Sequence, residues 1–149
     1  MNWNENKSVR LSQVCVIIFA ALLLLLDVFC YAAVRWFTGM RSMPRQTGIL
    51  MMITIYLCSV VGWVLLWKFW RLLRNIRAQV VFDAKNVALL RAVSWCCVGA
   101  GIICLVSSCY YLPFSAVAIA AGFMALIVRI VKNVFEQAIL MKDDLDLTI

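Results

Sequence analysis

Apolar residues form four long runs along the chain, and most charged residues lie between these runs. The runs cover residues 14–34, 49–67, 92–110 and 112–128. Each is about long enough for a helix to cross the ~30 Å hydrocarbon layer of a membrane. We therefore predict an all-α integral membrane protein, with a single domain over residues 1–149 in which four spans form a helix bundle.

Basic residues are distributed unevenly between the segments that flank the four runs. Eleven of the 14 lysine and arginine residues fall in the N-terminal tail, the loop 68–91 and the segment 129–149, which share one side of the membrane if the chain crosses it four times. Positively charged flanks stay in the cytoplasm. The sequence therefore predicts a multi-pass plasma-membrane protein with both termini in the cytoplasm.

The overall composition supports the membrane interpretation, which in turn offers an explanation for the positive net charge. The chain is 66% apolar and only 14% charged, with a mean hydropathy of +0.98, whereas soluble domains are about a quarter charged. The net charge of +7 then reflects topology and attraction to the lipid bilayer, whose inner surface is anionic. We expect no direct binding to nucleic acid.

The loop 68–91 has the pattern of a helix and not that of a flexible linker. Arg71, Arg74 and Arg77 recur every third residue, with apolar residues between them. This spacing is helical. It predicts that the second helix projects beyond the lipid headgroups with one basic face.

A turn and a new helix are predicted in the second half of this loop. We expect the second helix to break near Val81. Asp83 is typical of a helix N-cap, and Phe82 and Val87 have the spacing of a hydrophobic staple. The loop should therefore form a structured helical hairpin in the cytoplasm that leads into the third span.

The segment 129–149 is predicted to continue the fourth span as an amphipathic helix, because apolar and polar residues fall on opposite stripes. Two placements stay open: the helix lies on the inner leaflet, or it packs against the loop 68–91. Three carboxylates near its end, those of Asp143, Asp144 and Asp146, could form an electrostatic clasp with that loop. Exposed ion pairs stabilise by only about 0–1 kcal/mol each, so a clasp needs several pairs or apolar contacts from Leu145, Leu147 and Ile149.

The third and fourth spans are joined by so short a turn that they must form a tight antiparallel hairpin. Small residues on both spans allow close approach, and Ala118 and Gly122 form a small-xxx-small pair. We favour packing of this pair inside the bundle over a homodimer face.

Asp27 is the one acidic residue inside a span. An ionisable residue in the membrane is a functional candidate. At a similar depth, Thr54, Tyr56 and Ser107 are the candidates to hydrogen-bond its carboxyl group. Asp27 is either a proton or cation site or, as we favour, a neutral hydrogen-bonded group that fixes helix packing. Both interpretations place its side chain toward the bundle and not toward lipid.

No motif for catalysis or metal binding stands out. All seven cysteines lie in apolar runs, where free cysteine behaves as a small apolar side chain, and no CxxC pair occurs. A disulfide between Cys30 and Cys109 near the outer face stays open. The chain has no histidine, which argues against a zinc site, and it has no Gly-rich phosphate loop. We expect no enzyme activity and no cofactor.

Two segments resemble a family of bacterial four-span membrane proteins of unknown function. In that family a Phe, a small or acidic cap, an Asn and a Leu-Arg pair precede the third span, as they do in the run 81–91 here. The ending 143–149 is similar to the family's acidic "DLT" C-terminus followed by an aliphatic residue. Asp144 departs from the pattern, because an Asn-like residue is common at that place.

The resemblance implies no known catalysis. Members of the family are often encoded beside a small helix-turn-helix regulator of the Cro/Xre type. The resemblance therefore suggests a bacterial inner-membrane protein that engages a cytoplasmic DNA-binding regulator.

Two functional hypotheses follow. The first is a regulatory or binding module whose cytoplasmic face holds a small soluble partner. The candidate residues for that face are Arg71, Arg74, Arg77, Phe82, Asp83, Asn86, Arg91, Asp144, Asp146 and Leu147. The alternative is a small transporter that uses Asp27 as its proton or cation site.

Overall fold

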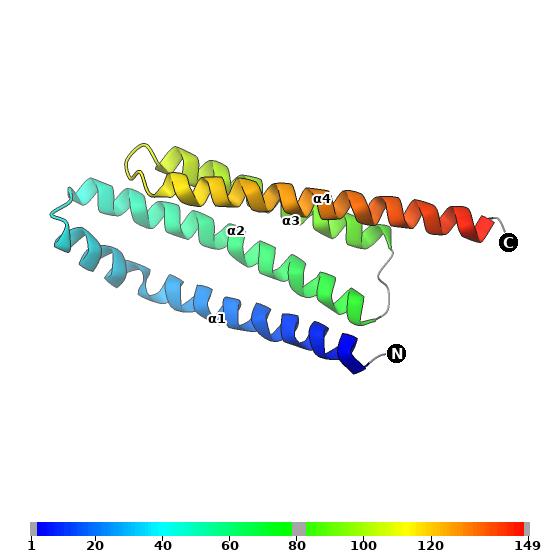
Figure 1. The fold of residues 1–149 in the computed structure, drawn as a ribbon. Helices are drawn as coiled ribbons and strands as arrows, with labels where there is room; N and C mark the ends of the chain where they lie inside the picture. Colours follow the sequence, from blue (N-terminus) through cyan, green and yellow to red (C-terminus); the bar gives the residue numbers. More distant parts are fainter. Residues whose placement is uncertain (1–2, 79–82, 148–149) are drawn as a thin grey trace.

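The fold consists of long α-helices. The structure is a computed structural model that describes residues 3–78 and 83–147. In this part of the chain it contains four α-helices and no strand: α1 (Trp3–Met40), α2 (Arg45–Arg77), α3 (Ala84–Ser107) and α4 (Phe114–Leu147) (Figure 1). The predicted all-α fold is confirmed.

Each helix contains a segment long and apolar enough to cross a membrane. The helices also run beyond the predicted spans. With 34 residues, α4 is about 51 Å long, well beyond the ~30 Å of a hydrocarbon core. The second helix continues through Arg77, as its arginine spacing predicts, and Ala78 caps its end. The predicted break at Val81 lies outside the described residues.

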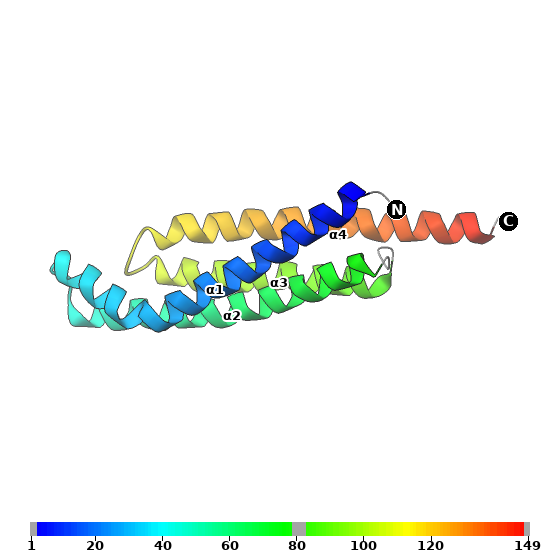
Figure 2. The ribbon, with the colours of Figure 1, turned by 90° about the horizontal axis from the view of Figure 1, so that it is seen from below.

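Consecutive helices run antiparallel and pack against one another in chain order. Among the described residues, the helix pairs in contact are α1 with α2, α2 with α3, and α3 with α4. The arrangement is therefore an open array, in which α1 packs along only one other helix (Figures 1 and 2). A closed bundle would bring α1 and α4 together as well.

The array has two ends of different character. One end holds both termini and the connection between α2 and α3 (Figure 1). We call it the basic end, after Arg71, Arg74, Arg77 and Arg91. The opposite end holds the α1–α2 and α3–α4 connections, and we call it the aromatic end, after Phe37, Tyr110, Tyr111 and Phe114.

An apolar core at the basic end joins three helices. Leu72 of α2, Leu89, Leu90 and Val93 of α3, and Val128 of α4 are buried together. Partly buried residues pack around this cluster, among them Phe69, Ile76 and Phe135. The predicted hairpin is thus a packed continuation of the membrane helices.

The core at the aromatic end joins α1 to its neighbours. Cys30, Val34 and Met51 are buried there, with aromatic side chains packed against them. The rings of Phe37 and Tyr111 meet edge to face, with centroids 5.9 Å apart. This contact connects α1 to the α3–α4 connection, as edge-to-face aromatic pairs commonly do at packed sites.

Close packing of α3 on α4 depends on small residues, as predicted. A Cβ atom added at Gly101 would lie 3.5 Å from the carbonyl oxygen of Ala118 and 3.6 Å from the Cβ of Ala121. Ala118 is buried within the array. Gly122 is exposed, and a Cβ atom added there would meet nothing within 4 Å, so the two members of the small-residue pair have different surroundings.

Candidate functional site

A buried hydrogen bond fixes the geometry of the hairpin at the basic end. Asn75 Nδ2 donates to Asn86 Oδ1 at 2.8 Å, joining the last turns of α2 to the first turn of α3. Asn86 is fully buried, and buried polar groups are costly unless they are paired. Its side chain is therefore part of the hairpin interior and is not exposed to a partner.

The predicted N-cap of α3 is confirmed. Asp83 Oδ1 accepts a hydrogen bond from the backbone N–H of Lys85 at 3.0 Å, which satisfies one of the unpaired donors at the start of a helix. Phe82, the predicted partner of Val87 in a hydrophobic staple, lies outside the described residues. Val87 itself is buried.

The three arginines on α2 are all exposed. Arg71, Arg74 and Arg77 lie on the outer surface of the helix, while Leu72 of the same helix faces the core. The packed core and the Asn75–Asn86 bond hold this segment in place. The three guanidinium groups are thereby presented on a fixed helical surface.

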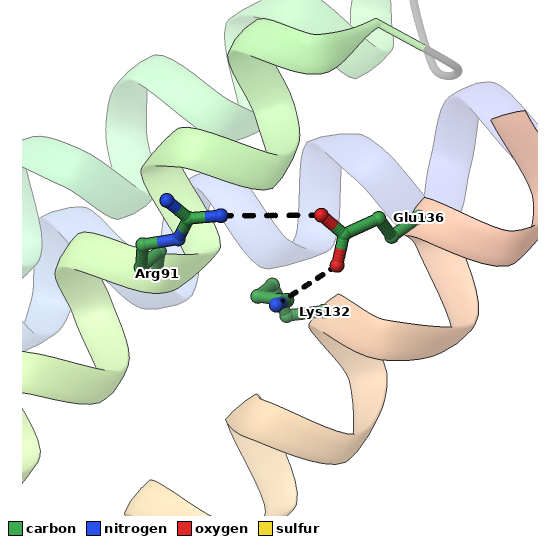
Figure 3. Close-up of polar contacts among 3 residues, drawn as sticks. All are labelled: Arg91, Lys132 and Glu136. Atoms are coloured by element: carbon green, nitrogen blue, oxygen red, sulfur yellow. Dashed lines mark ion pairs between the residues drawn. The ribbon is translucent and has the colours of Figure 1, made fainter.

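Arg91 belongs to a different cluster, between α3 and α4. Glu136 Oε2 lies 2.9 Å from Lys132 Nζ, one turn away on α4, and Glu136 Oε1 lies 3.9 Å from a guanidinium nitrogen of Arg91 (Figure 3). The hydrogen bond and positive charge of Lys132, with a further contribution from Arg91, lower the pKa of the Glu136 carboxyl group. The carboxylate therefore bridges the two helices.

A cleft opens beside this ion-pair cluster. It has a volume of about 190 Å³ and lies between α3 and α4, lined by Arg91, Ser94, Trp95, Val98, Arg129 and Lys132. Three of these six residues are basic. Ser94 Oγ donates to the carbonyl oxygen of Ala125 at 3.1 Å, which ties the two helices together beside the cleft.

Beyond the cleft, α4 packs against the start of α3. Phe135 contributes to the basic-end core, and Ile139 and Leu140 line a second hollow with Ala84 and Val87. Of the two predicted placements for the C-terminal helix, packing against the loop 68–91 is the one observed for this stretch.

The C-terminal part of α4 extends beyond the neighbouring helices. It continues past the end of α2 and the start of α3 (Figures 1 and 2). Asp144 is exposed, and the side chains of Asp143, Asp146 and Leu147 lie outside the described part of the structure. The predicted clasp stays a prediction. An ion pair between α4 and the loop 68–91 is observed at Arg91–Glu136.

Asp27 faces α2, and its hydrogen-bond partner differs from the predicted ones. Its Oδ2 accepts from Trp63 Nε1 at 3.0 Å, whereas Tyr56 donates to its backbone carbonyl oxygen at 3.3 Å. Thr54 and Ser107 bond to each other at 2.7 Å instead. The indole N–H was missed because Trp63 is about two turns beyond Tyr56 along α2, within reach only of a large side chain.

Two polar atoms near the middle of the α1–α2 interface are left without a partner. Asp27 Oδ1 and Ser59 Oγ are buried and form no hydrogen bond with any described residue. Ser59 lies one helical turn before Trp63, on the face of α2 that is buried in the array. The carboxyl group is thus satisfied at one oxygen only.

The described residues contain no group of three or more His, Cys, Asp or Glu side chains placed to hold a metal ion. All seven cysteines are free, including Cys30 and Cys109. Cys58 and Cys104 approach each other across α2 and α3, with their sulfur atoms 3.7 Å apart.

Sequence reasoning missed the cluster around Glu136. The signal was available, because Glu136 follows Lys132 at the helical spacing of four residues and is the one acidic residue between Arg129 and Lys142. The ion pair of Glu136 with Arg91 could not be predicted from residue spacing, because it depends on how α3 packs against α4.

One comparison with known proteins gave a match. Residues 3–149 match the model of a family described as protein of unknown function, DUF2975. Neither the curated proteins nor the solved structures contained a similar chain.

Proposed function

Since the chain belongs to the DUF2975 family of proteins of unknown function, we propose its role from its geometry: it is a membrane-anchored docking module that binds a soluble protein at the basic end. The observation that carries the proposal is the exposed row of Arg71, Arg74 and Arg77 on a hairpin with a buried core. A preorganised surface loses little conformational entropy on binding. We assign binding, and no catalysis, to this end.

The proposed sidedness rests on charge distribution. The basic end carries most of the lysine and arginine residues, and such flanks stay in the cytoplasm. We therefore place this end, with both termini, in the cytoplasm of a bacterial cell. The partner is then a cytoplasmic protein.

The chemistry of the arginine row defines the partner's surface. Arginine recognises carboxylates through paired, charge-assisted hydrogen bonds, so the partner presents a cluster of Asp or Glu side chains. A small helix-turn-helix regulator is the partner that the sequence resemblance suggests. Such a regulator would bind through an acidic surface separate from its basic DNA-binding face.

A crosslinking capture from native membranes tests the proposal. We expect the intact chain to capture a cytoplasmic protein, and the variant Arg71→Gln/Arg74→Gln/Arg77→Gln to lose most of that capture. The matched control is Arg35→Gln/Arg41→Gln/Arg45→Gln, which removes the same charge from exposed positions near the aromatic end and should capture normally. Equal capture by both variants would contradict docking on the arginine row.

The tail has a separate test. Deletion of residues 143–149 removes the acidic ending without altering the hairpin core. If the tail forms part of the docking surface, this deletion weakens capture in the same assay, whereas unchanged capture restricts the docking surface to the hairpin.

A second function is favoured by the unpaired oxygen of Asp27. A carboxyl group of which one oxygen is buried and has no hydrogen-bond partner among the described residues suits a proton or cation site in a small transporter. Proton-coupled flux into liposomes that disappears in Asp27→Asn would support transport. Flux that is unaffected by this substitution would remove Asp27 from the pathway.

A further inference from the structure

The cleft between α3 and α4 lies at a membrane boundary. Arg91 immediately precedes the apolar run 92–110, and Arg129 immediately follows the run 112–128. Because α3 and α4 are antiparallel neighbours (Figure 1), the start of one run and the end of the other are at the same level. The basic residues of the cleft are therefore at the depth of the lipid headgroups.

The residues that line the cleft change from basic to apolar along α3. Trp95 is one helical turn deeper than Arg91 and is 70% exposed, and Val98 lies almost one further turn into the apolar run. Tryptophan at an interface commonly contacts both headgroups and acyl chains. The cleft thus combines a cationic rim with an apolar wall that continues into the hydrocarbon layer.

The charges of the cleft are not balanced within it. Arg91, Arg129 and Lys132 line it, and Glu136 neutralises at most one of their charges. The carboxylate is close to Lys132, at 2.9 Å, and only loosely paired with Arg91, at 3.9 Å. An anion that entered the cleft would meet an excess of positive charge. The Lys132 side chain is 15% exposed, whereas Arg91 and Arg129 are exposed.

We propose that this cleft binds the phosphate group of an anionic phospholipid. Arg91, Arg129 and Lys132 surround the phosphate, and an acyl chain lies along Trp95 and Val98. Glu136 occupies part of the cationic rim when lipid is absent and competes with the phosphate. Basic pockets between membrane helices are suited to anionic headgroups, and the apolar wall selects a lipid over a soluble phosphate. This proposal does not depend on the docking function, because it uses a different surface.

Lipid binding to the purified full chain tests the proposal. The protein in a nonionic detergent would be titrated with dioleoyl phosphatidylglycerol, and native mass spectrometry would measure the bound lipid. Separate titrations would use dioleoyl phosphatidylcholine and inorganic phosphate. We expect one retained phosphatidylglycerol, and no comparable retention of phosphatidylcholine or phosphate. Each of Arg91→Gln, Arg129→Gln and Lys132→Gln should weaken phosphatidylglycerol binding about fivefold, the effect of one basic residue near an anionic surface.

Matched variants separate this site from general electrostatic attraction. The triple substitution of Arg71, Arg74 and Arg77 to Gln removes three charges at the same end, whereas each cleft variant removes one. It should change the affinity less than about twofold, because none of the three residues lines the cleft and exposed charges are screened by salt. Glu136→Gln should strengthen binding by removing the competing carboxylate. Arg91→Lys and Arg129→Lys, which keep the charge, should retain most of the affinity and show that the fold is intact.

Three results would overturn the proposal. The first is an equal loss of affinity in the control triple variant. The second is retention of phosphatidylcholine as strong as that of phosphatidylglycerol. The third is binding of inorganic phosphate that depends on Arg129 and Lys132 as strongly as phosphatidylglycerol binding does. That result would indicate that the cleft binds a soluble anion.

Discussion

The two ends of the helix array differ in the polar side chains that they carry. At the basic end, the arginines of α2 lie on the outside and an apolar core that includes Leu72 and Val93 lies beneath them. At the aromatic end, hydroxyl groups point inward: Thr54 and Ser107 are both buried, and each bonds to the other. Tyr110 joins this group through its own hydroxyl group and Thr54.

This difference indicates that the two ends have different roles. Inward hydroxyl groups at the aromatic end bond α2 to α3 and to the α3–α4 connection, and the Phe37–Tyr111 ring contact adds α1, so this end acts as a structural clamp. At the basic end, the exposed guanidinium groups of Arg71, Arg74 and Arg77 lie in a row on a packed hairpin. This regular row is the feature on which the proposed docking surface rests.

The largest effect is expected from Asn86→Ala at the basic end. The substitution leaves the Asn75 amide without its partner at a buried site and should lower the free energy of unfolding by about 2 kcal/mol. Unfolding by SDS in mixed micelles, followed by tryptophan fluorescence, measures the change. Asn133→Ala is the control, because Asn133 is exposed on α4 and should shift stability by no more than about 0.5 kcal/mol.

A smaller effect is expected from Thr54→Val at the aromatic end. This variant keeps the shape of the side chain and removes its bonds to Ser107 and Tyr110. Hydrogen bonds between helices in a membrane are worth about 0.6 kcal/mol on average, so we expect a loss of about 1 kcal/mol in the same assay. Thr38→Val is its control, since the Thr38 hydroxyl group bonds within its own helix. A larger loss for Thr54→Val than for Asn86→Ala would reverse the proposed ranking of the two ends.

The smallest effect is the pH dependence of the Glu136 ion pairs. Lys132 and Arg91 lower the pKa of Glu136 from its ordinary value of 4.5. A carboxyl group with a lowered pKa in the folded state stabilises the fold above the unfolded pKa, and this contribution is lost as the pH falls through the folded value. Below pH 4.5, the wild-type chain should therefore lose slightly more stability than Glu136→Gln. Parallel pH profiles for the two chains would show that the bridge between α3 and α4 adds no stability.

The helices could be predicted because their signals are local. Run length and the absence of charge define the spans, the spacing of Arg71, Arg74 and Arg77 extends α2 beyond the membrane, and Asp83 marks the start of α3. These features involve residues close together in the chain. They do not depend on how one helix packs against another.

The contacts of the candidate sites could not be predicted in the same way. The bond between Asn75 and Asn86 and the bridge from Arg91 to Glu136 depend on the rotation of each helix about its axis, which the sequence of one helix does not specify. The same applies to the bond between Asp27 and Trp63, which joins α1 to α2. An open array instead of a closed bundle likewise follows from packing between helices.

The central claim is that the basic end lies in the cytoplasm and presents the binding surface there. Gln46 near the aromatic end and Ala78 at the basic end are both exposed, so each can carry a new thiol in a Cys109→Ser background. Labelling of intact cells with a membrane-impermeant maleimide compares Gln46→Cys with Ala78→Cys, and the background chain without a new thiol gives the residual signal. The account predicts that Gln46→Cys is labelled in intact cells and Ala78→Cys only after the membrane is permeabilised. Labelling of Ala78→Cys in intact cells, with Gln46→Cys protected, would contradict it.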